Sequence, residues 1–264
     1  MCSPDAIVRR RLCIDLKGQF RRSERYASSA SLPFPFKEPT PTRRFWAERG
    51  VTMRIESGVA RIAAGVIAAI AWGGLLEEFM AVTAQGVSVA ESAWIILRYF
   101  TVLTNLLAAA VLTGVAFGLR AAQSQRLLAL LAISILFVGV VYVVLLRGLV
   151  ELSGKALIAD MIMHYVVPFL IVLFWLLFAP KGALRWSDAL LWSAYPLAYF
   201  FYALTRGASD GIYPYPFMDI PKAGWASVLT AVVIILALYI LVGLVLVWLG
   251  RWLDGLQRKP VSTR

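Results

Sequence analysis

His164 is the only histidine of the chain, and it lies in an apolar run, Ala156 to Ala179, where Asp160 and Tyr165 are the other titratable residues. About 20 apolar residues cross the roughly 30 Å of hydrocarbon in a bilayer, so this run predicts a membrane helix. An ionisable side chain at that depth is costly unless it faces a cavity or a partner. His164 is therefore a candidate functional residue.

Thr101 is the residue we expect to work with His164. It lies in a second apolar run, 94–117, which is predicted to cross the membrane in the same direction as the run around His164. At 1.5 Å per residue, the two side chains are expected roughly 13 Å and 11 Å below the same surface. The two helices can therefore present polar faces to each other.

A threonine next to a histidine supports nucleophilic catalysis. Neutral imidazole can take the proton of a threonine hydroxyl at pH 7 and so activate it. Asp160 shares a helix face with His164 and can orient it, while Arg98 or Asn105 can stabilise an oxyanion. Two alternatives stay open at this point: Thr104 is a rival on a different face, and both residues can be structural, since threonine also bonds to helix carbonyls.

Composition identifies the surroundings of these residues as a membrane. Apolar residues make up 60% of the chain and the mean hydropathy is +0.75, above the roughly 45–50% of soluble domains. The net charge of +11 fits basic cytoplasmic loops and contact with lipid headgroups better than nucleic-acid binding. Membrane lipids are thus the expected partners, and nucleic acid is not.

Metal and haem sites lack ligands in the apolar region. The two cysteines, Cys2 and Cys13, both lie near the N-terminus, and His164 is a lone histidine. A zinc site or a bis-histidine haem needs several such ligands. We therefore expect neither a metal nor an organic cofactor.

The chain divides into three parts. Residues 1–52 are basic and rich in serine and proline, which predicts a disordered tail, unless translation begins at Met53. Residues 53–252 form a predicted all-α domain of six transmembrane helices, and 253–264 form a short basic tail. The six apolar segments are 59–80, 94–117, 127–146, 156–179, 188–205 and 225–249. Basic residues cluster at one set of loop ends, which predicts that both termini are cytoplasmic and that the Thr101–His164 site opens toward the outer leaflet.

Further polar and aromatic residues belong to the same outer half. Glu77 and Glu78 end the first segment, and each either pairs with Arg98 or belongs to a solvated turn. A tyrosine stripe on the fifth segment either packs against neighbours or lines an acyl-chain cavity. The loop 211–219 contains two prolines that restrict its backbone, and we expect it to act as a lid. The stripe comprises Tyr195, Tyr199 and Tyr202, and the loop includes Tyr213, Tyr215 and Asp219.

Four short motifs resemble those of a known family. They are RYFT at 98–101, MHYVVPF at 163–169, YPLAY at 195–199 and GIYPYPFMD at 211–219. In order and spacing they resemble bacterial six-span proteins of the Pr-six-Pr family, which are similar to the eukaryotic androgen-induced and androgen-dependent membrane proteins. The resemblance covers roughly residues 57–250 and implies a bacterial cytoplasmic (inner) membrane location.

The resemblance implies a hydrolase. The eukaryotic proteins cleave fatty acid esters of hydroxy fatty acids with a threonine and a histidine, which by motif correspond to Thr101 and His164. The expected substrate is therefore a lipid ester. A small-molecule or proton-coupled transporter is the first alternative function, and a non-catalytic membrane interaction protein is the second. The lack of a visible internal repeat weakens the transporter interpretation.

Overall fold

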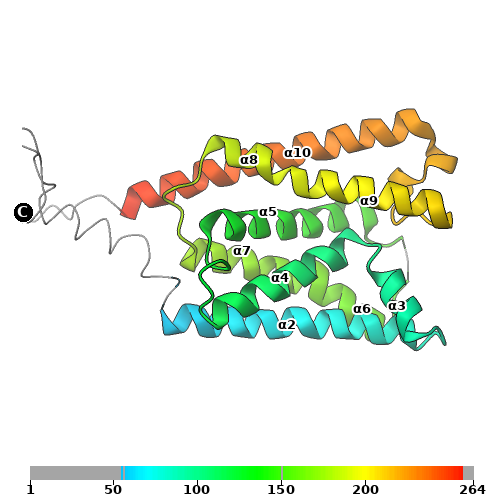
Figure 1. Ribbon diagram of the computed structural model, residues 1–264, viewed down its shortest axis with the longest axis horizontal. Helices are drawn as coiled ribbons and strands as arrows, with labels where there is room; N and C mark the ends of the chain where they lie inside the picture. The colour runs from blue at the N-terminus through cyan, green and yellow to red at the C-terminus, as the bar shows by residue number, and fades with distance from the viewer. Residues whose placement is uncertain (1–54, 56, 150, 258–264) are drawn as a thin grey trace, which may run out of the picture. The chain divides into compact units, whose positions relative to one another are not determined.

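The computed structural model describes residues 55, 57–149 and 151–257, and every regular element in these ranges is helical. The proposed tail 1–52 and the last residues of the C-terminal tail lie outside them. The helices are α2 (Gly58–Thr83), α3 (Val89–Ile96), α4 (Phe100–Ala116), α5 (Gln125–Val141), α6 (Gly154–Met161), α7 (Val167–Phe178), α8 (Trp186–Trp192), α9 (Ala194–Asp210) and α10 (Ile220–Gln257) (Figure 1). Three short segments complete the path: π-helical η1 (Tyr142–Leu146) and η2 (Ile162–Val166), and the 3-10 turn η3 (Pro216–Met218).

Four continuous helical stretches are long and apolar enough to cross a membrane: Gly58–Thr83, Gln125–Leu146, Gly154–Phe178 and Ile220–Leu256. A fifth crossing results if α3 and α4, which meet at 99°, count as one broken span. The chain is therefore an all-α integral membrane protein. The predicted segment 188–205 falls on α8 and α9, which have 7 and 17 residues.

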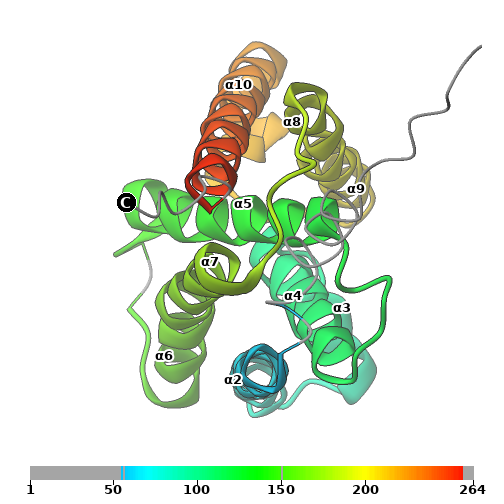
Figure 2. The ribbon, with the colours of Figure 1, turned by 90° about the vertical axis from the view of Figure 1, so that its left-hand side faces the viewer.

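Helix α5 is central to the bundle. In Figure 2 it lies between α8–α10 on one side and α2, α4 and α7 on the other. Its buried residues include Leu131, Ile133 and Ile135, none of them accessible to solvent, and Ser134 bonds to Tyr239 of α10 at 2.8 Å. Helix α5 therefore joins the two sides of the bundle.

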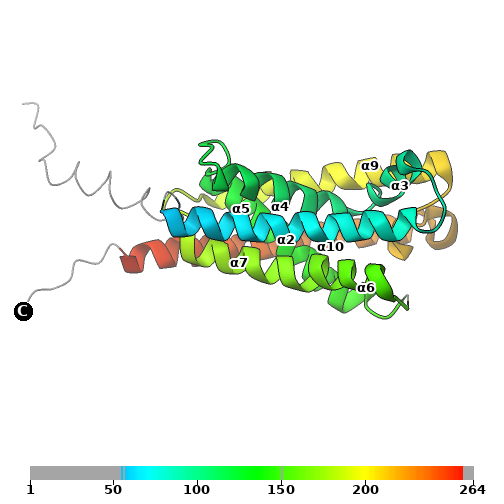
Figure 3. The same cartoon turned by 90° about the horizontal axis from the view of Figure 1, so that it is seen from below.

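Small residues let α2 approach the segment that carries His164. Helix α2 runs beside α6 and α7 (Figure 3), and a Cβ atom added at Gly74 would lie 2.6 Å from the Ile162 side chain. Glycine at such a contact allows two membrane helices to pack closely. This packing holds η2 against α2 and buries the Met163 side chain.

The bend between α3 and α4 corrects the prediction of one straight helix over 94–117. Arg98 was expected one turn from Thr101 on a common face, but it lies in the non-helical break, and Tyr99 is extended with φ −92° and ψ 134°. Tyrosine hydroxyls satisfy the backbone groups that the break frees: Tyr202 donates to the Leu97 carbonyl at 3.1 Å and Tyr199 to that of Arg98 at 3.0 Å. Buried backbone polar groups need such partners, so these contacts stabilise the bend.

Candidate active site

Thr101 and His164 contact each other, as their expected depths predicted. The Thr101 Oγ1 atom lies 3.2 Å from His164 Nε2. Thr101 belongs to the first turn of α4, and His164 to the π-helical segment η2 in the middle of the fourth predicted span. Two residues separated by more than sixty positions thus share one hydrogen bond.

Asp160 holds the other nitrogen of the imidazole. His164 Nδ1 lies 3.0 Å from Asp160 Oδ1 and 3.1 Å from the Asp160 carbonyl oxygen. Both of these atoms are acceptors, so Nδ1 carries the proton and Nε2 is left to accept from the Thr101 hydroxyl. This tautomer is the one that a general base needs.

Tyr142 is a member of the site that we did not predict from the sequence. Its hydroxyl donates to Asp160 Oδ2 at 2.6 Å. Its ring also stacks on the His164 imidazole, with the centroids 3.9 Å apart and the planes at 18°. The available signal was a lone hydroxyl-bearing aromatic residue near the end of the apolar segment 127–146.

The two π-helical segments face each other at this point. In a π-helix each amide bonds to the carbonyl five residues earlier, and the Val167 amide bonds to the Ile162 carbonyl in this way. In this region the Asp160 carbonyl accepts from the His164 ring nitrogen at 3.1 Å. Gly139 allows the close approach, since a Cβ atom there would lie 3.1 Å from the His164 carbonyl oxygen.

Asn105 and Thr104 have structural contacts rather than contacts with the His164 ring. The Asn105 amide nitrogen donates to the carbonyls of Thr101 at 2.9 Å and Met163 at 3.4 Å, and so ties α4 to η2. Within the described ranges, its Oδ1 atom is buried without a hydrogen-bond partner. Thr104 bonds instead to the Tyr195 hydroxyl at 3.1 Å.

Arg98 is paired with an aspartate that we did not predict. Its Nη2 atom lies 2.7 Å from Asp210 Oδ2, and Arg206 Nε lies 3.6 Å from the same oxygen. Both arginines are buried, with exposed fractions of 5% and 4%. The ion pairs fasten the bend to the end of α9, so Arg98 supports the site from a distance.

Glu77 and Glu78 do not form the solvated turn that we considered. Both lie within α2 and are half-buried. Glu78 lies close enough to Asp160 for their charges to interact, whereas Glu77 Oε2 is buried without a hydrogen-bond partner in the part of the chain that is described. The counter-charge of Arg98 is Asp210 instead.

The loop 211–219 reaches the site through Tyr215. The Phe100 amide donates to the Tyr215 hydroxyl at 3.1 Å, and this hydroxyl also interacts with the Thr101 side chain. Burial raises the pKa of the Tyr215 phenol, so the phenol is neutral at physiological pH. Tyr213 and Asp219 lie elsewhere: the Tyr213 ring covers Gly207, and Asp219 pairs with Lys222 at 2.7 Å.

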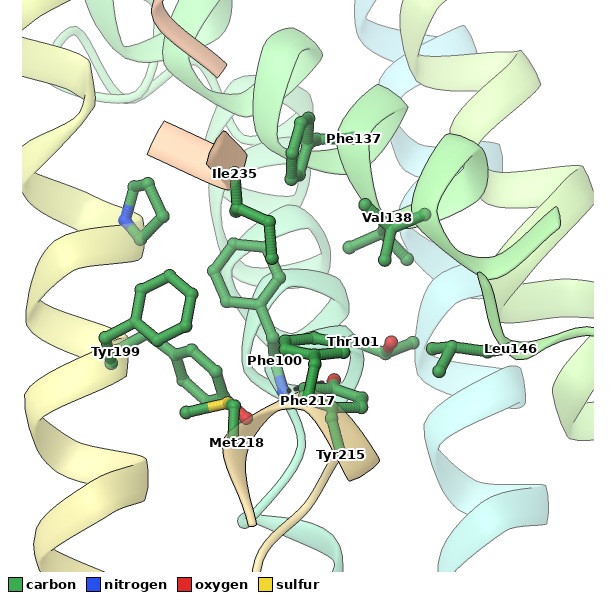
Figure 4. Close-up of a pocket in the computed structure, with 13 residues that line it drawn as sticks. Phe100, Thr101, Phe137, Val138, Leu146, Tyr199, Tyr215, Phe217, Met218 and Ile235 are labelled. Atoms are coloured by element: carbon green, nitrogen blue, oxygen red, sulfur yellow. Dashed lines mark hydrogen bonds between the residues drawn. The ribbon is translucent and has the colours of Figure 1, made fainter. Parts of the chain in front are cut away.

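Two spaces adjoin the Thr101–His164 pair. Thr101 lines an apolar cavity of about 40 Å³, in which Figure 4 shows it grouped with Tyr215 and Phe217, with Phe137 and Ile235 farther away. Tyr199 also lines this cavity, while Tyr195 and Tyr202 use their hydroxyls to bond neighbouring helices. His164 lines a more open groove of about 770 Å³ between α5–η1 and η2–α7.

Across residues 55, 57–149 and 151–257, no three histidine, cysteine, aspartate or glutamate side chains come together as metal ligands. Comparison of the chain with protein-family models, curated proteins and solved structures found no match.

Proposed function

We propose that this protein is an intramembrane lipid-ester hydrolase with Thr101 as nucleophile and His164 as general base. The observation that carries the proposal is the continuous set of contacts from the Thr101 hydroxyl through the imidazole to the Asp160 carboxylate. Hydrolases that form a covalent intermediate use this same order of groups, in which a nucleophile contacts a base and the base contacts an orienting carboxylate. The motif resemblance to the Pr-six-Pr family leads to the same pair.

The chemistry takes two steps. Thr101 Oγ1 attacks the ester carbonyl carbon while His164 Nε2 takes its proton, and His164 then returns that proton to the departing alkoxide, which leaves an acyl-threonine. Water attacks the acyl carbon with His164 as base, the carboxylic acid leaves and Thr101 regains its proton. Asp160 stabilises the imidazolium in both steps.

Stabilisation of the oxyanion requires donors near Thr101 Oγ1. The N-terminal end of α4 carries a positive partial charge, and Thr101 lies in its first turn. The Tyr215 hydroxyl accepts from the Phe100 amide and lies beside the Thr101 side chain, so its own proton is available to an oxyanion formed there. Arg98 is occupied by Asp210, so its contribution is to maintain the bend that exposes this helix end. The mechanism uses no metal or organic cofactor.

We further propose six membrane crossings with both termini cytoplasmic. Helices α3–α4 form the second crossing and α8–α9 the fifth, as the loop charges suggest. In a bacterial cytoplasmic membrane this topology opens the site toward the outer leaflet. Substrates then come from the bilayer, and the resemblance implies esters of the fatty acid–hydroxy fatty acid type.

Labelling with a hydroxyl-directed phosphonate probe tests the assignment. The purified wild-type protein should be labelled on Thr101, and Thr101→Ala should remove the label. His164→Ala should slow labelling by at least about 100-fold, the usual minimum for loss of a general base. Thr104→Ala is the matched control on the same helix and should keep the label. Undiminished labelling of Thr101→Ala, in a protein that elutes as the wild type does, would refute the proposal.

A further inference from the structure

The two spaces beside the site are lined by different members of the Thr101–His164 pair. Thr101 lines the small cavity and His164 does not, whereas His164 lines the open groove and Thr101 does not. An ester that reacts at this pair therefore meets a different space on each side of its carbonyl group. The two halves of the substrate are expected to differ accordingly.

We propose that the small cavity binds the acyl group of the substrate and that the groove binds its alcohol chain, so that the preferred substrates are short-chain acyl esters of long, apolar alcohols. This inference rests on the proposed hydrolase function and narrows its substrate class. It departs from the long acyl chains that the family resemblance implies.

The chemistry of the two residues assigns the two sides. The acyl group becomes bonded to Thr101 Oγ1, so its chain must extend into the space that Thr101 lines. The departing alkoxide must receive its proton from His164 Nε2, so the alcohol must lie on the side of the imidazole. The alcohol then leaves through the groove that His164 lines.

The size of the cavity limits the acyl chain. A volume of about 40 Å³ holds roughly three water-sized groups, which corresponds to an acyl group of about four carbons once the reacting carbon at Thr101 is counted. Tyr215, Phe217 and Met218 from the loop and its 3-10 turn line it, as does Ile235 of α10. A long acyl chain would collide with these side chains.

The groove, by contrast, suits a long hydrocarbon chain from the bilayer. Its volume is about 770 Å³, and apart from His164 and Tyr165 its lining side chains are apolar. Val140 and Val144 on its rim have exposed fractions of 50% and 71%, on the surface that faces lipid in a membrane protein. An alcohol chain can therefore enter sideways without leaving the hydrocarbon.

Turnover of two ester series by purified protein in detergent tests the proposal. One series varies the acyl chain from acetate to palmitate on hexadecanol, and the other varies the alcohol from ethanol to hexadecanol on acetate. We expect hexadecyl acetate and butanoate to be cleaved at least about tenfold faster than hexadecyl palmitate, a discrimination within reach of one pocket. Lengthening the alcohol should not reduce turnover.

Matched variants separate the two sides. Ile235→Ala should enlarge the cavity and raise octanoate turnover relative to acetate, whereas Ile234→Ala, its lipid-facing neighbour with 53% exposure, should leave that ratio unchanged. Val144→Trp should narrow the groove and slow hexadecyl acetate relative to ethyl acetate. Leu145→Trp, which changes a residue outside the groove lining, should not.

The outcomes distinguish this inference from the proposed function. Thr101-dependent cleavage that favours long acyl chains, with the same chain-length profile in Ile235→Ala, would overturn the assignment of the two spaces and leave the hydrolase intact. Cleavage of neither series in a Thr101-dependent way would overturn both. Short-acyl preference that shifts in Ile235→Ala but not in Ile234→Ala would support it.

Discussion

Replacement of Tyr142 by phenylalanine should slow the reaction without unfolding the protein. Phenylalanine keeps the ring that stacks on His164 at 3.9 Å, and removes only the hydroxyl that donates to Asp160 at 2.6 Å. A hydrogen bond to a charged group contributes about 1.5–3 kcal/mol. Asp160 keeps its contact with His164 Nδ1 at 3.0 Å in this variant, and we take the lower figure. If that energy helps to hold Asp160 against the imidazole, the rate should fall about tenfold, since about 1.4 kcal/mol corresponds to a factor of ten.

The assay is the initial rate of phosphonate labelling, followed by ester turnover on the best substrate. Tyr213→Phe is the matched control, because it also removes a phenol hydroxyl but the Tyr213 ring covers Gly207 rather than His164. A double-mutant cycle with Asp160→Asn should show that the two changes are not additive, as expected for residues in one network. A Tyr142→Phe protein that reacts at the wild-type rate, or two additive losses, would refute the role of Tyr142 in positioning.

Three other changes probe the supports of the site. Gly139→Ala should displace the imidazole by a few tenths of an ångström and slow labelling about tenfold by misplacing the base. Gly73→Ala is the control and should not slow labelling, because an added Cβ there meets nothing within 4 Å. Equal labelling rates in the two variants would contradict the close-approach argument. Asp210→Asn removes the carboxylate shared by two buried arginines and should lower the midpoint of thermal unfolding more than Asp219→Asn does. The lysine partner of Asp219 is 85% exposed, so that variant should lose under about 1 kcal/mol. The same thermal shift in both variants would argue against the arginine cluster. Asn105→Ala loses two donated hydrogen bonds and should destabilise the protein by about 1–3 kcal/mol, as measured by thermal unfolding in detergent. An unchanged unfolding midpoint would show that the hydrogen bonds between α4 and η2 are dispensable.

The local pattern of apolar residues predicted the helices that are apolar along their whole length. It failed at the bend between α3 and α4, where the chain changes direction. Segments 127–146 and 156–179 coincide with continuous helical stretches because a long apolar run in lipid must satisfy its own backbone. The segment 94–117 is also largely apolar but is bent, and tyrosine hydroxyls from α9 and the loop accept or donate the bonds that the break frees. Those tyrosines follow the bend by about a hundred positions, so no local pattern indicates it.

The sequence by itself indicated that the protein is helical and membrane-embedded, and it predicted that His164 and Thr101 lie at one depth. Apolar run length and helix rise are sufficient for these conclusions. Tertiary structure alone decided which groups surround that pair: Tyr142 on Asp160, Asp210 on Arg98, a small cavity lined by Thr101 and an open groove lined by His164. These contacts depend on how helices rotate and pack against one another, which is determined by side chains far apart in the chain rather than by any single segment.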